Sequence, residues 1–298
     1  MILSDSLQIG DVTVTRVVEW TGGLLAGPDL LPDSTPDDWG DAGLVPMALQ
    51  AWVVRSRGAT IVVDPGEGND RTRPQAPALD HLATDHLAAL AAAGAAPEDV
   101  DVVIDTHVHH DHVGWNTRLD GDAFVPTFPQ ARYLIAAPDV AWFDPARAGL
   151  RPPVRSDAER VRREGSLQLW ADSVQPVLDA GLVDAWEGSV HLDDQLALEL
   201  TPGHTPGSSV LWIRSAGETA VLVGDLLHTP LQLAHPDWSS CFCEDPVAAA
   251  RTRRRVLEQA ADEQALLVPA HLPGHGAVRI ERDGSRFRVV EWADLAEV

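Results

Sequence analysis

Four side chains that commonly bind metal ions stand within six consecutive residues of this chain: His107, His109, Asp111 and His112. An apolar stretch, 102–105, predicts a buried strand just before them. Alternate side chains of an extended backbone share a face, so His107 and His109 can reach one ion together. Asp111 and His112 follow where the chain turns, and they can reach a neighbouring point. Imidazole and carboxylate without thiolate favour zinc, with manganese, iron or cobalt as alternatives.

Three later segments each have a ligand-type residue at the end of a predicted strand, beside small residues that let the backbone approach a site. These residues are His204, Asp225 and His271. One such histidine alone is usually structural, but three segments in this order support a metal site. His275 lies four residues beyond His271 and competes with it. We favour His271 as the ligand because it directly follows the strand.

The sequence resembles the metallo-β-lactamase fold superfamily, whose signature His-x-His-x-Asp-His is matched by residues 107–112. This resemblance implies an α/β fold, a four-layer αβ/βα sandwich of two mixed sheets flanked by helices, with the site at one edge. It assigns His107, His109 and His204 to one metal ion. It assigns Asp111, His112 and His271 to a second. It also implies that Asp225 bridges the two ions and that Asp64 orients a histidine ligand by a hydrogen bond.

The chemistry that this ligand set implies is hydrolysis by a hydroxide shared between two divalent metal ions about 3.5–4 Å apart. The hydroxide attacks a carbonyl or phosphoryl centre, and Asp111 can take and return a proton beside it. Members that do redox chemistry with two irons typically have a carboxylate at the position of His109, so the histidine favours hydrolysis. Authentic zinc β-lactamases generally lack the bridging Asp225, so its presence points to lactonases, esterases and phosphotriesterases.

Segments 51–54, 113–116, 224–228 and 270–273 resemble the branch that holds methyl parathion hydrolase and N-acyl-homoserine lactonase-like enzymes. A lactone or ester is therefore the expected substrate. A phosphotriester is the alternative. From another class, a mononuclear iron persulfide dioxygenase also uses two histidines and an aspartate in this fold.

Several other residues near the motifs are candidates for catalytic, pocket-lining or structural roles. Small lactonases place a tyrosine beside the metals, but Tyr133, the single tyrosine here, lies in a predicted strand away from the motifs. His228 is therefore our candidate to assist catalysis, and Trp115 is a candidate wall of the pocket. His110 is expected to point away from the metals because alternate positions face outward. The two cysteines, Cys241 and Cys243, are expected to be structural.

The elements that must position these residues follow from hydrophobic patterning. Strands are expected at 12–18, 51–54, 60–64, 133–136, 196–200, 210–214, 220–223, 266–268, 278–281 and 286–291. Helices are expected at 82–93 and 247–262, an irregular helical stretch at 139–178, and a long loop at 22–41. Leu30 and Trp39 in that loop are candidates for pocket or dimer contacts. The alternation of strands and helices predicts one layered domain spanning residues 1–298.

Composition limits the partners. The chain has 298 residues with a formal net charge of −23, and all its cationic side chains are arginines. Such an acidic surface repels polyanions, so we expect no nucleic acid and no anionic membrane as a partner, but a small-molecule substrate. Two cysteines and a start without signal-peptide features predict a cytoplasmic protein. A homodimer is a further expectation.

Overall fold

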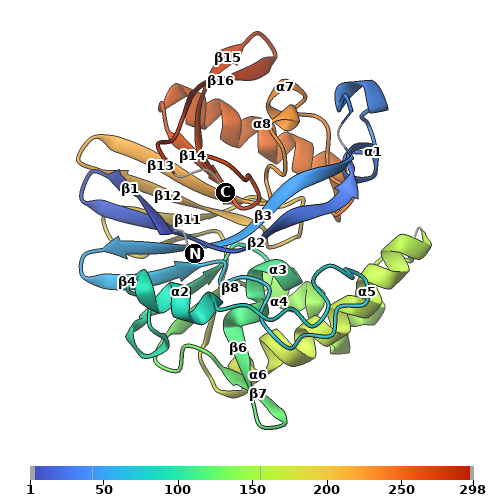
Figure 1. Cartoon of the computed structure of the whole chain (residues 1–298), viewed down its shortest axis with the longest axis vertical. Coiled ribbons are helices and arrows are strands. Elements are labelled where there is room, and N and C mark those ends of the chain that lie inside the picture. Colours follow the sequence, from blue (N-terminus) through green and yellow to red (C-terminus); the bar gives the residue numbers. More distant parts are fainter. Residues whose placement is uncertain (1–3, 42, 155, 296–298) are drawn as a thin grey trace.

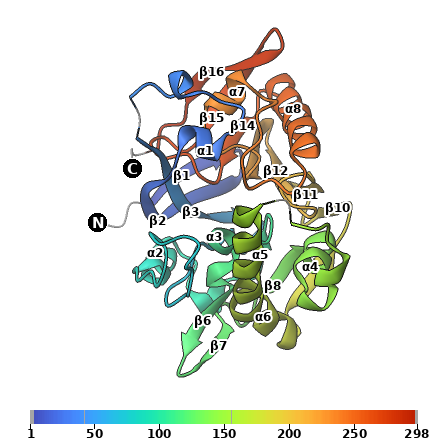
Figure 2. The same cartoon turned by 90° about the vertical axis from the view of Figure 1, so that its right-hand side faces the viewer.

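The computed structural model describes residues 4–41, 43–154 and 156–295. Two seven-stranded β-sheets face each other across an apolar core, and helices cover the outer face of each sheet (Figure 1 and Figure 2). The layers therefore run helix, sheet, sheet, helix. This architecture confirms the predicted α/β sandwich of two mixed sheets.

The first sheet has the strand order β1-β2-β3-β4-β5-β8-β9. These strands span Ser4–Ile9 (β1), Val12–Ala26 (β2), Leu44–Ser56 (β3), Ala59–Val63 (β4), Val102–Asp105 (β5), Arg132–Ala136 (β8) and Val183–Trp186 (β9). From β1 to β4 the pairing is antiparallel, and β4, β5, β8 and β9 run parallel to one another.

The second sheet has the order β10-β11-β12-β13-β14-β15-β16. These strands span Ser189–His191 (β10), Leu196–Leu200 (β11), Ser209–Ser215 (β12), Glu218–Gly224 (β13), Leu266–Pro269 (β14), Val278–Asp283 (β15) and Arg286–Trp292 (β16). Only β13 and β14 pair in parallel in this sheet. A separate hairpin is formed by Thr117–Asp120 (β6) and Ala123–Pro126 (β7).

The α-helices are Gly27–Leu30 (α1), His86–Ala92 (α2), His110–Val113 (α3), Ala137–Phe143 (α4), Asp157–Leu169 (α5), Gln175–Asp179 (α6), Leu231–Ala234 (α7) and Pro246–Asp262 (α8). Short 3₁₀ turns span Pro36–Asp38 (η1), Pro97–Asp99 (η2), Gly114–Asn116 (η3) and Pro145–Leu150 (η4), and a π turn spans Trp170–Val174 (η5). Among the described residues, none of these helices is both long and apolar enough to traverse a bilayer.

Burial on both faces explains why the central strands are apolar without interruption. In β5, Val102 and Ile104 point into the core between the two sheets, whereas Val103 points to the helices outside the first sheet. The outer face of the second sheet packs on α8 through Val256 and Leu257. A strand covered on both sides needs apolar side chains at every position, and such strands tolerate parallel pairing.

Most predicted elements are confirmed with adjusted ends. The strand pair at 51–54 and 60–64 is part of β3 and β4, joined by a turn in which Arg57 and Gly58 have positive φ. The helix expected at 247–262 is α8, which Asp245 caps by accepting from the Ala248 amide. The helix expected at 82–93 is confined to α2. The irregular stretch at 139–178 contains α4, η4, α5, η5 and α6.

The prediction of a long loop at 22–41 is wrong for its first part. Strand β2 continues to Ala26 because residues 20–26 pair with the beginning of β3. This pairing outweighs the low strand propensity of the two glycines there. Leu30 is fully buried in a small cluster with Val45 and Met47, and the Trp39 ring packs against that cluster. Both side chains thus pack within the chain rather than in a pocket.

One edge of the molecule collects the segments that matter for function. The carboxyl ends of β4 and β5 meet there because these strands are parallel, and so do those of β13 and β14. Strand β11 runs in the same direction as β13, since both pair antiparallel with β12. All five of these strands lead directly into the segments singled out by the sequence.

Candidate metal centre

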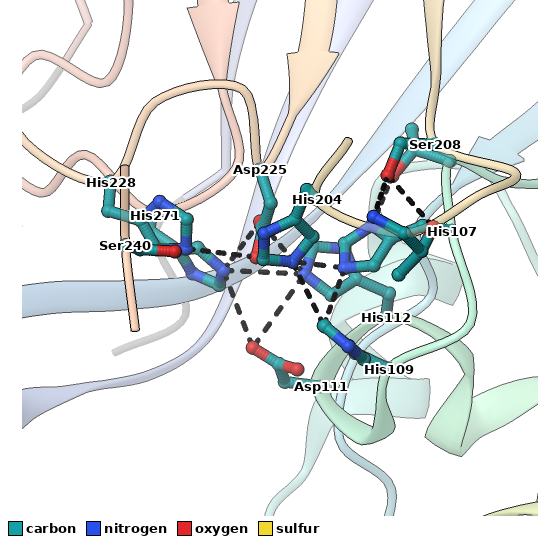
Figure 3. A network of polar contacts seen from close by, with 12 residues as sticks. His107, His109, Asp111, His112, His204, Ser208, Asp225, His228, Ser240 and His271 are labelled. Atoms are coloured by element: carbon teal, nitrogen blue, oxygen red, sulfur yellow. Dashed lines mark hydrogen bonds and ion pairs between the residues drawn. The ribbon is translucent and has the colours of Figure 1, made fainter. Parts of the chain in front are cut away.

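The segment after β5 carries the first four candidate ligands. The chain bends at Thr106 and His107, is extended at His109 and becomes helical at His110, where α3 begins. The residues before the helix bring His107 and His109 to a common point, and the helical turn brings Asp111 and His112 to a second point (Figure 3). The change of backbone conformation, which the sequence suggested, therefore separates the ligands into two groups.

The other three candidates arrive from the second sheet. His204 lies in the loop after β11, Asp225 directly follows β13, and His271 follows β14. The turn before Asp225 depends on Gly224, which has a φ of +49°. A Cβ atom there would lie 2.6 Å from the Thr106 hydroxyl, so a larger residue would displace this side chain, which donates to Asp64.

Two groups of ligand-type atoms result. In the first, His109 Nδ1 lies 3.0 Å from both His107 Nε2 and His204 Nε2. In the second, His271 Nε2 lies 3.3 Å from His112 Nε2 and 3.4 Å from Asp111 Oδ2.

Asp225 stands between the groups. Its Oδ2 lies 3.1 Å from His204 Nε2 and 3.6 Å from His107 Nε2, on the side of the first group. Its Oδ1 lies 2.9 Å from His271 Nε2 and 3.1 Å from His112 Nε2, on the side of the second. One carboxylate thus presents a different oxygen to each group, which is the arrangement required to bridge two cations.

The outer nitrogens of the histidines are held by neighbouring groups. Asp64 lies with Oδ2 3.0 Å from His112 Nδ1, and it also accepts hydrogen bonds from the Thr106 amide and hydroxyl. His271 Nδ1 donates to the Ala48 carbonyl over 3.0 Å. A neutral imidazole that donates from Nδ1 has its lone pair on Nε2. The contact with Ala48 therefore turns the Nε2 lone pair of His271 toward the cluster, as a metal site requires, and Asp64 faces the outer nitrogen of His112.

The electrostatics of the cluster also suit cations. Burial lowers the pKa of His107 and His109 well below the usual imidazole value, so these rings are neutral and can bind metal. Burial acts to lower the pKa of His204, but Asp225 and Cys243 together outweigh it and raise that pKa to about 10. The buried carboxylates thus favour positive charge at the centre, and divalent cations supply such charge.

His228 lies inside the site. Its side chain is 1% exposed, and Nε2 lies 3.2 Å from Asp225 Oδ2. Burial lowers its pKa to about 4, against the opposing effect of Asp225, so the ring is neutral. Tyr133, by contrast, is buried in β8, where its hydroxyl donates to the Asn116 carbonyl. This hydroxyl bonds to backbone groups of Asn116 and Phe128, outside the two groups of candidate ligands.

Other residues near the motifs have different surroundings. His110 belongs to neither group, and its Nδ1 lies 2.5 Å from Glu67 Oε2 and 4.0 Å from Asp111 Oδ1. His275 contacts the Leu295 carbonyl rather than the cluster. Trp115 is 4% exposed and donates from Nε1 to Glu19. The prediction that Trp115 walls the pocket is wrong for the cavity at this site, because its ring packs beneath the surface.

Cys243 has a closer relation to the site than the sequence suggested. The thiol is buried, and Sγ lies 3.7 Å from His204 Nδ1, on the side of the ring opposite the cluster. Cys241 is partly exposed, and its amide donates to the Leu30 carbonyl. Both cysteines are free thiols. Structural roles remain the prediction for both, and Cys243 also contacts a candidate ligand.

Asp139 is a site-supporting residue that the sequence reasoning missed. It is fully buried in α4 and accepts from the Val108 amide, the Thr205 hydroxyl and the Gly207 amide, over 2.6–2.9 Å. Burial raises its pKa to about 6, although these hydrogen bonds act in the opposite direction. The carboxylate ties the segment after β5 to the loop after β11. Its sequence context, Ala-Pro-Asp, indicates only the start of a helix.

Replacing Asp139 with asparagine is expected to weaken metal binding or activity by about 10- to 100-fold. The amide keeps one acceptor oxygen but turns an NH₂ group toward backbone donors. Metal titration of the purified variant, with circular dichroism to check folding, measures the effect. Asp184→Asn, at an exposed aspartate paired with Arg132, is the matched control. Unchanged metal affinity and activity in Asp139→Asn would contradict the positioning role.

A cavity of about 510 Å³ opens beside the cluster. It is lined by the inward-facing His109, Asp111, Asp225, His228 and His271, and by side chains of β2, β3 and α5. Its size is that of a small-molecule site, and the candidate metal ligands form one end of it. A substrate in this cavity would therefore contact the metal centre directly.

Comparison with known proteins agrees with this geometry. The family model described as "Metallo-beta-lactamase superfamily" matches residues 46–271. The chain belongs to the metallo-beta-lactamase superfamily. The matched range contains every candidate ligand, and the superfamily fold with its His and Asp cluster makes the protein a metal-dependent hydrolase.

Among sequence relatives, "Metallo-beta-lactamase domain-containing protein 1" of Mus musculus is 28% identical over 64% of this chain and 54% of its own length. The Rattus norvegicus protein of the same name is 30% identical over 64% of this chain and 56% of its own length. The chain thus spans about half the length of the curated relatives it matches.

Solved structures share the fold over nearly the whole chain. Hydrolase AbOPH of the beta lactamase superfamily aligns with a TM-score of 0.80 at 22% identity, covering 99% of each chain. AidC, a dizinc quorum-quenching lactonase, aligns with a TM-score of 0.77 at 21% identity, covering 97% of each chain. A probable metal-dependent hydrolase from Staphylococcus aureus aligns with a TM-score of 0.79 at 18% identity, covering 98% of this chain and 99% of its own.

Proposed function

We propose that the protein hydrolyses a lactone or an ester at a centre of two zinc ions. The observation that carries this proposal is the position of Asp225, whose two oxygens face two separate groups of ligand-type atoms. The first ion would be held by His107, His109 and His204. The second would be held by Asp111, His112 and His271. The imidazole and carboxylate donors favour zinc.

Two bound divalent ions would supply Lewis acidity and a hydroxide nucleophile near neutral pH. The chain's own residues complete the chemistry. Asp111 lines the cavity and can hold a proton that passes from the attacking water to the leaving alcohol. His228 is buried at the cavity wall and, as a neutral ring, can donate a hydrogen bond to the oxygen on which negative charge develops.

The lactone or ester class is supported by the cavity and by one structural relative. The cavity combines apolar walls with the metal centre at one end, which suits an uncharged scissile carbonyl beside an apolar chain. AidC, with the same fold, was crystallised with N-hexanoyl-L-homoserine, the product of its lactonase reaction. Assembly as a homodimer remains a prediction, which sedimentation analysis would test.

A substrate panel tests the proposal. Zinc-reconstituted protein would be compared on acyl-homoserine lactones, aryl esters, a paraoxon-type phosphotriester and a β-lactam, with elemental analysis of the protein as purified, before reconstitution. We expect two zinc ions per chain and the highest kcat/KM on a lactone or an ester. A preference for the β-lactam would overturn the argument from Asp225. One iron per chain with oxygen consumption would replace the proposal with persulfide dioxygenase chemistry.

A further inference from the structure

The cavity beside the metal centre has an apolar wall and a cationic wall. Its apolar lining includes Leu24, Leu25, Met47, Phe143, Leu169 and Phe242. Three arginines line it as well: Arg151, Arg162 and Arg163. The chain has a net charge of −23, so three arginines on the wall of one cavity indicate that this wall attracts an anionic ligand.

Two of these arginines have no carboxylate partner among the described residues. Arg163 is paired, since it donates to Glu159 Oε1 over 2.6 Å. Arg162, half-buried on α5, makes neither an ion pair nor a hydrogen bond within the described part of the chain. Arg151 donates from Nε to the Trp142 carbonyl, but its Nη2 is buried without a hydrogen-bond partner. Buried donors are normally satisfied, so this nitrogen lacks the partner that such a donor usually has, and the Arg151 side chain lines the cavity.

The position of Arg151 relative to the metal centre is set by one aromatic ring. Phe143 meets His109 edge to face, with 6.0 Å between ring centroids. Arg151 Cζ lies 5.3 Å from the same Phe143 ring. A substrate that reaches from the metal centre past Phe143 therefore arrives at the Arg151 guanidinium.

The charge balance of this end of the cavity fits a single negative charge. The acidic residues that line it away from the metal centre are Glu159, which is engaged by Arg163, and Glu244. Glu244 raises the pKa of Arg151, which burial lowers, but it forms no ion pair with it. Among the described residues that line this end, three arginines against two glutamates leave an excess of one positive charge, which a carboxylate matches better than a dianionic phosphate.

We propose that the natural substrate carries a carboxylate at the far end of an apolar segment, and that Arg151 and Arg162 bind this carboxylate. The inference rests on the proposed function, because the scissile ester or lactone would occupy the metal end of the same cavity. Guanidinium groups bind carboxylates through charge-assisted hydrogen bonds, which are stronger than neutral ones. The two arginines thus select substrates and do not take part in bond cleavage.

Two esters of equal chain length test the inference: the mono-p-nitrophenyl ester of octanedioic acid, which is anionic, and p-nitrophenyl octanoate, which is neutral. The zinc-loaded wild type should prefer the anionic ester in kcat/KM by about 10-fold or more. The double variant Arg151→Gln/Arg162→Gln should lose that preference, mainly through a higher KM for the anionic ester, and its kcat/KM should fall far more for the anionic ester than for the neutral one. Activity on the neutral ester also shows that the variant is folded.

Arg160→Gln is the matched control. Arg160 lies on α5 as well, but it is exposed and paired with Glu164 and Asp157, and it does not line the cavity. Its replacement should leave the preference unchanged. Glu244→Gln, which removes a competing carboxylate, should increase the preference. Equal kcat/KM for both esters in the wild type, or the same loss in Arg160→Gln, would overturn the inference.

A binding measurement separates this inference from the proposed function. Octanedioate would be titrated calorimetrically into the wild type, the double variant and Arg160→Gln. We expect roughly 10-fold weaker binding in the double variant alone. If neither ester is hydrolysed but this difference is found, the proposed function fails and the carboxylate site stands. Equal octanedioate affinity in all three proteins would overturn the carboxylate site itself.

Discussion

The variant Asp225→Asn is expected to lose about 1,000-fold in kcat/KM, because metal polarisation contributes several kcal/mol to such reactions. Asparagine keeps the size of the side chain but removes its charge and replaces one carboxylate oxygen by NH₂. One of the two groups of candidate ligands then meets a donor where it needs an acceptor. Elemental analysis should show fewer than two metal ions per chain, and steady-state kinetics on the preferred ester or lactone should show the loss.

Asp262→Asn provides the control for this prediction. Asp262 is exposed, and its ion pair with Arg282 lies at the surface, where such pairs contribute little to stability. The Asp262→Asn variant should retain wild-type metal content and activity. If Asp225→Asn kept two metal ions and full activity, the bridging role and the two-metal centre would both be wrong.

Removing the metal ions is expected to abolish hydrolysis and to lower the stability of the fold. The candidate ligands come from the carboxyl ends of strands in both sheets, so bound cations would join the two sheets at this edge. A ligand present at 1,000 times its Kd stabilises the native state by about 4 kcal/mol. Thermal unfolding after chelation should therefore occur at a distinctly lower Tm, and added zinc should restore both Tm and activity.

Chelation of the Asp225→Asn variant is the control for this experiment. Because the metal centre of the variant is damaged, chelation should lower its Tm by less than it lowers that of the wild type. Manganese and cobalt can be compared with zinc at equal free concentration. Chelated protein with an unchanged Tm and unchanged activity would show that the cluster is not a functional metal site.

The metal centre could be predicted from the sequence because most of its candidate ligands lie close together in the chain and the others follow predicted strands. Four candidate ligands stand in one six-residue stretch, and the other three follow predicted strands. Their convergence needed only the general rule that strand ends meet at one edge of a layered fold. The resemblance to the superfamily then supplied the division into two groups, and the distances around Asp225 agree with that division.

Residues that support the site from other elements could not be predicted in this way. Asp139 contacts three donors from two loops far from it in sequence, and nothing in its local context distinguishes it from a surface residue at a helix start. Trp115 follows the motif closely, yet its ring turns toward Glu19 and away from the cavity. Side-chain direction after a short helix depends on packing partners, which the local sequence does not specify.

The substrate cavity shows the same limit more clearly. Its cationic wall joins Arg151 and Arg162 to a site whose candidate ligands lie 39 residues or more before or after them. The extension of β2, expected to be a loop, adds Leu24 and Leu25 to the opposite wall. By itself, the sequence determined the fold class and identified the His and Asp residues that form the candidate metal centre, because both depend on local patterns and residue chemistry. Only the tertiary structure decided which side chains surround the substrate, because that depends on long-range packing between the two halves of the sandwich.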